Sequence, residues 1–434
     1  MPLKKVHFAT LGCKTNQYET QAMREKFLKA GYEEASRPED ADLFVVNTCT
    51  VTGEGDRKSR SVIRRLHREN PGAKIAVTGC YATLNQEEIQ KLPGVSFVIA
   101  NQEKEKIVER VNLDAAGKFC GEGDESESNR YSDLSISFFA DRTRAFVKVQ
   151  DGCDHACTYC KVVIVRGPSR SRAEADILEE ASRLAEGGYQ EIVLTGIQLG
   201  AYGDEWENGL NLTSVLKKLC AVKGLRRIRL SSIDPSDVTD EFIRCMSEEP
   251  KICAHLHLPL QSGDDTILKA MKRAYRRDQY LRIVEKLRKA VPDFSLTTDV
   301  MVAFPGETEE HFKNTVRVLE ETLPLKAHIF PFSAREGTRA ADFVGRLTPE
   351  VSRERVTALQ AVSKDLAMRY KQRFAGRITE VLVENPNEKG ELEGHTSNYL
   401  KVCFQGDVRW VGSLKKVRLL EAGPEHFRGE VITD

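Results

Sequence analysis

The chain has 434 residues, of which 40% are hydrophobic and 30% are charged, and its formal net charge at pH 7 is zero. This composition is typical of a globular protein with two or three domains and excludes a disordered chain, and no apolar run approaches the ~20 residues of a membrane span. The neutral total disfavours a surface that is basic throughout, although basic clusters at 57–68, 166–172 and 369–373 could contact phosphate.

Eleven cysteines are scattered along the chain. An odd and dispersed set does not form the framework of a small disulfide-rich domain, so metal binding or plain burial is the better explanation. The amino-terminal residues lack the apolar core and cleavage site of a secretory signal. We therefore expect a cytoplasmic protein whose thiols are reduced.

The first region, residues 1–112, alternates short apolar strands with helical segments. Strands are expected at Val6–Thr10, Leu43–Thr48 and Ile75–Gly79, with helices at Gln17–Ala30 and Asp56–His67. Strand–helix–strand alternation predicts a parallel sheet with right-handed crossovers.

A cysteine follows each of these three strands: Cys13, Cys49 and Cys80. Because parallel strands end at the same sheet edge, where α/β proteins bind their ligands, the three thiols should converge. A single such cysteine could be a small buried side chain, but three at equivalent strand ends favour a metal centre. We predict an iron–sulfur cluster held by three cysteines, with one iron lacking a protein ligand.

Residues 113–138 are rich in glycine, serine and acidic residues, and they predict a linker between the first region and the next.

Three further cysteines, Cys153, Cys157 and Cys160, lie in the run GCDHACTYC directly after a predicted strand. Three thiolates on one short loop can hold three irons of a four-iron cluster and leave the fourth open to a ligand. The spacing resembles the signature of the radical S-adenosylmethionine (SAM) enzymes, which favour an aromatic residue such as Tyr159 before the last cysteine. A zinc knuckle is the alternative, but His155 does not complete a zinc pattern and no second paired-cysteine motif follows nearby.

The middle region, residues 139–370, repeats strand and helix about six times. One clear amphipathic helix is expected at Ala173–Glu186. The pattern predicts a partial (βα)6 barrel whose active site lies at the carboxyl ends of its strands, where the Cys153 loop and several polar loops follow. The expected strands are Phe146–Gln150, Glu191–Gly196, Arg227–Ser232, His255–Gln261, Leu296–Gly306 and His328–Ser333.

The last region, residues 371–434, follows two long helical patterns at Glu309–Glu321 and Pro349–Arg373. It contains short β-runs about ten residues apart, separated by glycine and Asn-Pro turns, which predicts a small five-stranded barrel. The fold class is therefore α/β, with an amino-terminal parallel α/β domain, a central partial barrel and a small terminal β-barrel.

Motifs along the chain carry a family resemblance: TLGCKTNQYET, NTCTVT, TGCYA, GCDHACTYC, RGPSRSR, RLSSIDP, HLHLPLQSGDD, TTDVMVAFPGETEE and HIFPFSAREGT. With them, nearly the whole chain resembles the methylthiotransferases of the radical SAM superfamily, and the terminal barrel resembles the TRAM domain of these enzymes. The first motif is most similar to that of the branch acting on threonylcarbamoyladenosine in tRNA. After Cys160 the chain departs from the usual family pattern, because it reads KVVIVRG without the expected proline and tyrosine.

The resemblance implies two [4Fe-4S] clusters and SAM as cofactors. One cluster would bind to Cys153, Cys157 and Cys160 and cleave SAM, and the auxiliary cluster would bind to the amino-terminal cysteines and present sulfur. Residues expected to contact SAM are Tyr159, Gly196, Ser232 and Gln261.

The resemblance also implies partners and a reaction. The enzyme would add a methylthio group to C2 of N6-threonylcarbamoyladenosine beside the anticodon, so the tRNA anticodon stem-loop is the expected macromolecular partner. A reductant protein such as flavodoxin or ferredoxin would supply electrons, and no membrane partner is expected. The alternatives are a methylthiotransferase for isopentenyladenosine in tRNA, one for a ribosomal-protein aspartate, and a non-catalytic metal-binding RNA regulator.

Overall fold

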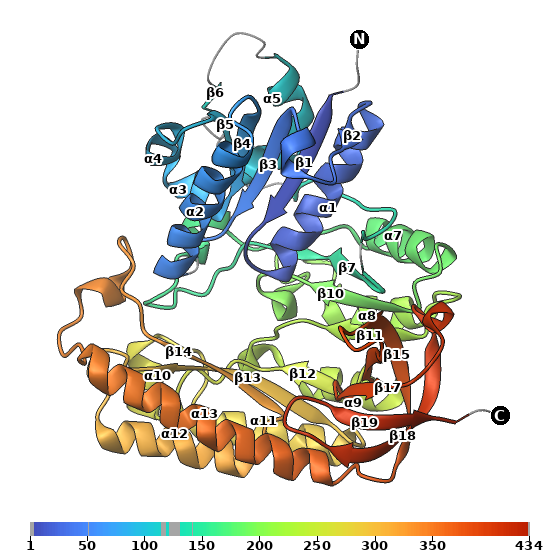
Figure 1. Ribbon diagram of the computed structural model, residues 1–434. Helices are drawn as coiled ribbons and strands as arrows, with labels where there is room; N and C mark the ends of the chain where they lie inside the picture. Colours follow the sequence, from blue (N-terminus) through green and yellow to red (C-terminus); the bar gives the residue numbers. More distant parts are fainter. Residues whose placement is uncertain (1–3, 51, 114–118, 121–130, 141, 433–434) are drawn as a thin grey trace. The chain divides into compact units, whose positions relative to one another are not determined.

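The computed structural model describes residues 4–50, 52–113, 119–120, 131–140 and 142–432, and Figure 1 shows the ribbon. Most of the linker predicted at 113–138 lies outside the described residues. The chain divides into two compact units. Unit 1 comprises Met1–Ala140, Gln150–Arg172 and Ser333–Thr338, and unit 2 comprises Asp141–Val149, Ala173–Phe332 and Arg339–Asp434.

Unit 1 is built on a parallel six-stranded sheet in the order β2-β1-β3-β4-β5-β6 (Figure 1). Its elements are β1 (Lys5–Thr10), α1 (Lys14–Lys29), β2 (Glu33–Glu34), β3 (Leu43–Thr48), α2 (Gly53–Glu69), β4 (Lys74–Gly79), α3 (Cys80–Leu84), α4 (Gln86–Gln90), β5 (Val95–Ile99), α5 (Ile107–Leu113) and β6 (Phe119–Cys120), followed by β8 (Gln150–Asp151), α6 (Val162–Arg166) and β9 (Arg170–Ser171).

Helices cover both faces of this sheet, and its strand β3 is buried at every position. In β3, Phe44 and Val46 pack into a core that includes side chains of α2, α3 and α4. Leu43 and Val45 point the other way, into a core that includes α1 and α5. Strands buried on both faces are typical of parallel sheets with crossover helices. The predicted parallel α/β region is therefore confirmed.

Helix α2 begins where its sequence directs. The hydroxyl of Thr52 accepts a hydrogen bond from the backbone N–H of Gly55 at 3.1 Å, and Glu54 and Asp56 occupy the first turn. Both features stabilise a helix amino terminus. Four residues therefore separate the end of β3 from the start of α2, and Cys49 is the first of them.

Unit 2 contains six parallel strands that follow one another in chain order. Three form the sheet β11-β10-β7 and three form the sheet β12-β13-β14, and isolated bridges join Ile228 to Ile252 and Ser232 to His257 between the two. The elements are β7 (Arg144–Lys148), α7 (Glu174–Glu186), β10 (Glu191–Thr195), α8 (Leu212–Cys220), β11 (Arg227–Leu230), α9 (Asp240–Glu248), β12 (His255–His257), α10 (Asp265–Ala270), α11 (Arg277–Ala290), β13 (Ser295–Val302), α12 (Glu309–Thr322), β14 (Lys326–Pro331) and α13 (Pro349–Gln372).

The carboxyl-terminal part of unit 2 is a closed barrel with the strand order β15-β16-β17-β19-β18. It contains both antiparallel and parallel strand pairs. Tyr370, near the end of α13, and Phe374, just after this helix, pack into the core of the barrel. Its strands are β15 (Ile378–Pro386), β16 (Leu392–Thr396), β17 (Lys401–Phe404), β18 (Leu414–Ala422) and β19 (Phe427–Val431). The predicted six-strand α/β region and five-stranded barrel are both confirmed. No helix within the described ranges has the length and apolar character that crossing a bilayer requires.

Candidate functional site

The three amino-terminal cysteines lie where neighbouring strands of unit 1 end. Strands β1, β3 and β4 pair side by side, with Thr10 opposite Asn47 and Thr48 opposite Gly79. Cys13 comes three residues after β1, Cys49 directly follows β3, and Cys80 opens α3 after β4. Cys13 is exposed, Cys49 half-buried and Cys80 buried. The structure thus places all three thiol-bearing loops on the carboxyl edge of one sheet.

Asn16 connects the loops of Cys13 and Cys49. Its side-chain amide donates to the carbonyl oxygens of Leu11 at 2.8 Å and Thr48 at 3.0 Å, and its oxygen lies 3.7 Å from the Cys13 thiol. From β3, the Asn47 side chain donates to the backbone oxygen of Asn16 at 2.9 Å. Asn16 is buried. These bonds fix the spacing between two of the three predicted ligands.

Asn101 performs a similar role at the third cysteine. Its side-chain amide lies 3.7 Å from the Cys80 sulfur and 3.1 Å from the carbonyl oxygen of Val165. Val165 belongs to α6, five residues after Cys160. One side chain of unit 1 therefore contacts both the Cys80 thiol and the segment that follows the second cysteine trio.

The second trio lies in the same unit, on a loop stabilised by its own backbone. The N–H of Cys153 donates to Gly167 at 3.1 Å, the N–H of Cys160 donates to Cys157 at 3.1 Å, and the N–H of Val162 lies 3.4 Å from the Cys160 sulfur. Burial raises the pKa of the Cys153 thiol to about 12, and the neighbouring thiols Cys160 and Cys157 add to the shift.

The number of ligands distinguishes between zinc and an iron–sulfur cluster. Each trio offers three thiols. A structural zinc ion takes four protein ligands, whereas a four-iron cluster held by three cysteines keeps one iron open to another ligand. The residues present fit such a cluster.

A buried charge cluster made of Glu19, Lys104, Asp151 and Arg166 lies beside the thiols. Arg166 donates to Glu19 at 2.8 Å and to Asp151 at 2.9 Å, and Lys104 also pairs with Glu19. Burial alone would lower the pKa of Arg166, but Asp151, the Cys80 thiol, Glu19 and the Cys13 thiol hold that pKa well above its ordinary value. A second nitrogen of Arg166 donates to the Asn16 oxygen at 2.8 Å.

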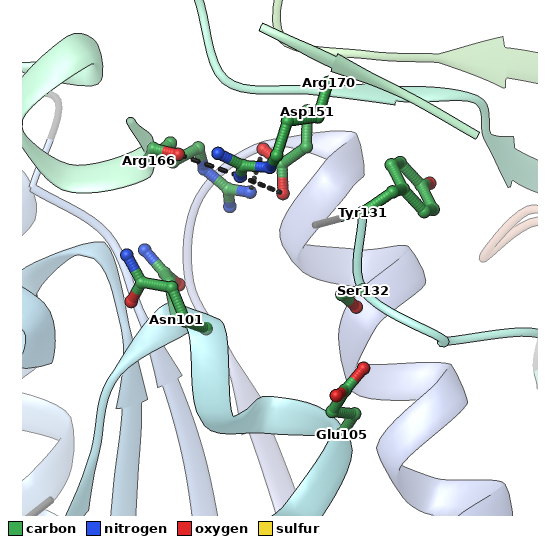
Figure 2. A pocket seen from close by; sticks show the side chains of 8 residues that line it. Asn101, Glu105, Tyr131, Ser132, Asp151, Arg166 and Arg170 are labelled. Atoms are coloured by element: carbon green, nitrogen blue, oxygen red, sulfur yellow. Dashed lines mark hydrogen bonds and ion pairs between the residues drawn. The ribbon is translucent and has the colours of Figure 1, made fainter. Parts of the chain in front are cut away.

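Figure 2 shows Arg166 and Asp151 at the wall of a small pocket. Its volume of about 30 Å³ has room for ordered water. A cavity of this size therefore lies directly beside the charge cluster. Its lining residues are Asn101, Gln102, Glu105, Tyr131, Ser132, Asp151, Arg166 and Arg170.

The sequence left open that the basic cluster 166–172 contacts phosphate. In the structure this cluster does not form an open phosphate-binding surface. Arg166, Arg170 and Arg172 are all buried. Arg170 donates to the backbone oxygen of Arg166 at 2.9 Å, and Arg172 donates to the Tyr18 hydroxyl at 3.3 Å. These guanidinium groups have protein partners, so they connect segments of unit 1 instead of facing solvent.

The segment Ser333–Thr338 contributes one more contact near Cys49. Arg335 donates to the Thr50 hydroxyl at 2.8 Å and to the Asp56 carboxylate at 2.6 Å. Arg335 is 8% exposed. The motif HIFPFSAREGT therefore helps to fix the residue after a predicted ligand, a role that its sequence alone does not reveal.

The expected SAM contacts fall into both units. Tyr159 lies in the cysteine loop of unit 1. In unit 2, Gly196, Ser232 and Gln261 follow β10, β11 and β12, so these three lie at the carboxyl ends of successive strands. Gln261 has a left-handed φ of 59°, and its buried side-chain oxygen has no hydrogen-bond partner among the described residues. Such strain and an unsatisfied polar atom are features of ligand sites.

We expect Gly79→Ala to destabilise unit 1 by about 3 kcal/mol or more, because two costs add. Gly79 has φ 100° and ψ −175°, a conformation reserved for glycine, and an added Cβ would lie 2.3 Å from the Thr48 oxygen. The matched control is Gly188→Ala, where φ is 94° but no atom lies within 4 Å of the added Cβ. Calorimetric melting of both variants checks this, and an equal loss in the two would contradict the steric argument.

Comparison with known proteins places the chain in a family. Residues 5–100 match the uncharacterized protein family UPF0004, and residues 147–319 match the radical SAM superfamily. A solved radical SAM methyltransferase, TsrM from Kitasatospora setae, superimposes with a TM-score of 0.54 at 14% identity, covering 76% of this chain and 75% of that chain. This likeness supports the fold.

Curated relatives match over nearly the full length. The threonylcarbamoyladenosine tRNA methylthiotransferase MtaB of Bacillus subtilis is 41% identical, covering 98% of this chain and 96% of the relative, and that of Thermotoga maritima is 40% identical, covering 99% and 98%. The tRNA-2-methylthio-N(6)-dimethylallyladenosine synthase of Aquifex aeolicus is 34% identical, covering 99% of both chains. The chain therefore belongs to the radical SAM methylthiotransferase family, in the branch of the threonylcarbamoyladenosine tRNA enzymes.

Proposed function

We propose that this protein adds a methylthio group to C2 of N6-threonylcarbamoyladenosine next to the anticodon of tRNA. The observation that carries the proposal is the pair of cysteine trios in unit 1, since one trio alone would suffice for SAM cleavage. Relatives that bear this activity in their names are 36–41% identical over at least 95% of the chain, whereas the dimethylallyladenosine relatives are 34% identical.

Six cysteines would hold two [4Fe-4S] clusters. Cys153, Cys157 and Cys160 would hold the cluster that binds SAM, and the amino-terminal trio would hold the auxiliary cluster. When bound, the clusters and SAM supply a radical that removes hydrogen from an adenine carbon, together with the sulfur and the methyl group. Each trio would leave one iron without a protein ligand, which both roles require.

The chain's own residues would orient these groups. Asn16 and Asn101 hold the loops of the auxiliary trio, and the backbone N–H of Val162 lies against the Cys160 sulfur. Hydrogen bonds to cluster sulfurs stabilise the more reduced state. Gly196, Ser232 and Gln261 are proposed to contact SAM at the strand ends of unit 2, and Tyr159 from the cysteine loop.

The terminal barrel is the proposed grip on RNA. Lys416 and Arg418 alternate with the buried Val417 and Leu419 along β18, so both cations are exposed on its outer face. Exposed cations on a small barrel suit phosphate contacts, and a target base in an anticodon loop can be splayed out for reaction. A reductant protein such as flavodoxin or ferredoxin would supply electrons in the cytoplasm.

Deletion of the gene tests the proposal. Chromatography and mass spectrometry of tRNA nucleosides are expected to show loss of the methylthio form of threonylcarbamoyladenosine and accumulation of its unmodified parent. The methylthio form of isopentenyladenosine and the mass of ribosomal proteins should stay unchanged, which serves as the internal control. If the threonylcarbamoyladenosine product persists, or if one of the other two products disappears instead, the assignment is wrong.

A further inference from the structure

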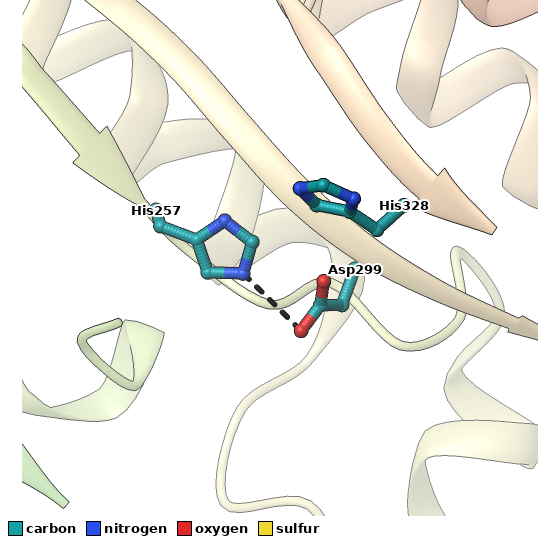
Figure 3. Close-up of side chains that lie close together, drawn as sticks. All are labelled: His257, Asp299 and His328. Carbon is teal, nitrogen blue, oxygen red and sulfur yellow. Dashed lines mark ion pairs between the residues drawn. The ribbon is translucent and has the colours of Figure 1, made fainter. Parts of the chain in front are cut away.

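Three side chains outside the cysteine sites converge in unit 2. His257 lies on β12, Asp299 on β13 and His328 on β14, and their donor atoms all lie within 4.8 Å of one another. Figure 3 shows the two imidazoles and the carboxylate facing one another. The distance between His257 Nε2 and Asp299 Oδ2 is 3.2 Å. Two donors bound to one ion at about 2.1 Å lie about 3 Å apart, so this pair already has the spacing of metal ligands.

Strand register explains why the three groups share a side of the sheet. Asp299 is directly opposite His328, and His257 is opposite Thr297, two positions before Asp299. Since side chains alternate along a strand, residues at these positions point to the same face. Leu296 and Val300 point to the opposite face of β13, and both are buried.

The opposite face of this sheet is packed against helices, which leaves the polar face open. Thr298, which points to the same face as Leu296 and Val300, accepts a hydrogen bond from Tyr280 of α11 at 3.2 Å. Figure 1 shows α11, α12 and α13 along that side of β13 and β14. His257 and Asp299 have side chains that are 16% and 30% exposed, and His328 is exposed. An ion could therefore reach the three donors.

A second layer of contacts orients His257. Its Nδ1 lies 3.0 Å from the Thr297 hydroxyl, which also lies 2.9 Å from Nε2 of His255. If Thr297 accepts the Nδ1 proton of His257 and donates its own to His255, the Nε2 lone pair of His257 faces Asp299. Metal-binding histidines are commonly oriented in this way, through a hydrogen bond from the other ring nitrogen.

We propose that His257, Asp299 and His328 bind a first-row divalent metal ion at a site separate from the six cysteines. Two imidazoles and one carboxylate form a donor set that Mn²⁺, Fe²⁺ and Zn²⁺ accept. Three protein ligands leave coordination positions for water or for an oxygen of a bound ligand. The inference goes beyond the proposed reaction and stands on the geometry of unit 2 alone.

Binding of Mn²⁺ to the reconstituted holoenzyme tests the site. The room-temperature electron paramagnetic resonance signal of aqueous Mn²⁺ disappears as the ion binds, and iron–sulfur clusters give no signal under these conditions. We expect one strong Mn²⁺ site per chain in the wild type. The affinity should fall at least about tenfold in Asp299→Asn, which replaces an anionic ligand by a neutral amide oxygen, and in His328→Ala, which removes a ligand. His328 is exposed, so its replacement disturbs little packing.

The matched control is His311→Gln, because His311 also lies near a carboxylate, Asp264, but at 3.9 Å. That variant should keep wild-type affinity. Unchanged cluster absorption in every variant shows that the chain remains folded and loaded. Two results overturn the inference: a wild type that takes up no stoichiometric Mn²⁺, or ligand variants that bind it as tightly as His311→Gln does. Neither result bears on the tRNA product.

Discussion

Cys157→Ala is expected to abolish SAM cleavage, whereas Cys49→Ala is expected to preserve cleavage and abolish methylthio transfer. The reason is the division of the six thiols into two trios on different loops of unit 1. Loss of one thiolate from a three-ligand cluster leaves too few bonds to hold it, so each variant should lose one cluster and keep the other.

Three measurements on anaerobically reconstituted protein check this expectation. Iron should fall from about eight atoms per chain to about four in both variants. Deoxyadenosine formed in the presence of a strong reductant reports SAM cleavage, and nucleoside analysis of added tRNA reports methylthio transfer. The matched control is Cys220→Ala, since Cys220 is a buried thiol on α8 of unit 2, outside both trios. It should retain the iron content and both activities of the wild type.

The pattern across the two variants is decisive. If cleavage falls equally in Cys49→Ala and Cys157→Ala, the two trios do not have separate roles, and the proposed division is wrong. If the protein binds zinc and forms no deoxyadenosine, a metal-binding RNA regulator becomes the better description.

The sequence predicts much of the fold because its strong signals are local. The strands after which the cysteines come are short apolar runs, and the structure has them at nearly the predicted bounds, as with Leu43–Thr48. The convergence of Cys13, Cys49 and Cys80 at one sheet edge follows from parallel topology, which strand–helix alternation predicts well. The five terminal β-runs also form the expected closed barrel.

The positioning residues could not be predicted because their partners are distant in sequence. Arg166 lies 150 residues from Asn16, and only the folded chain shows that it is buried between carboxylates and not exposed to phosphate. Asn101 carries no motif signal, yet it contacts Cys80 and the segment after Cys160. Side-chain partners of this kind depend on tertiary packing, which no local pattern encodes.

The histidine–aspartate site illustrates the same limit within unit 2. His257 and Asp299 belong to two motifs that carry the family resemblance, HLHLPLQSGDD and TTDVMVAFPGETEE. The sequence, however, predicts the functional groups in the loops that follow the strands and not in the strands themselves. The register that brings Asp299 beside His328 sets the geometry. A shift of one residue would turn Asp299 to the packed face.

Arg166→Met is expected to destabilise unit 1 by about 3–5 kcal/mol, the usual cost of removing one partner from a buried ion pair. Within the buried cluster Arg166 pairs with two carboxylates, those of Glu19 and Asp151. Without Arg166, Glu19 keeps only Lys104 and Asp151 keeps only Arg170 at 4.0 Å, so each buried carboxylate loses a charged partner. The hydrogen bond to Asn16 is lost as well, which loosens the loops of Cys13 and Cys49.

The measurement must report on unit 1 alone. Both tryptophans, Trp206 and Trp410, lie in unit 2, so their fluorescence follows the other unit. Pulsed hydrogen–deuterium exchange of peptides from β1, β3 and β4, recorded over a series of urea concentrations, follows the correct region. The urea concentration at which half of the molecules lose protection in these peptides should be lower in Arg166→Met than in the wild type. It should stay unchanged in Arg37→Met, which removes a guanidinium whose side chain is 71% exposed in its pair with Asp40.

A double variant separates loss of charge balance from loss of packing. Adding Asp151→Asn to Arg166→Met removes one of the two carboxylates that Arg166 neutralises while preserving the shape of the side chain, so the double variant should be more stable than the sum of the two single losses predicts. Asp151 also accepts the N–H of Gly152 at 2.8 Å, and an asparagine oxygen can keep that bond. If the two losses simply add, the cost of Arg166→Met comes from packing, and the buried charges of unit 1 are not coupled to one another.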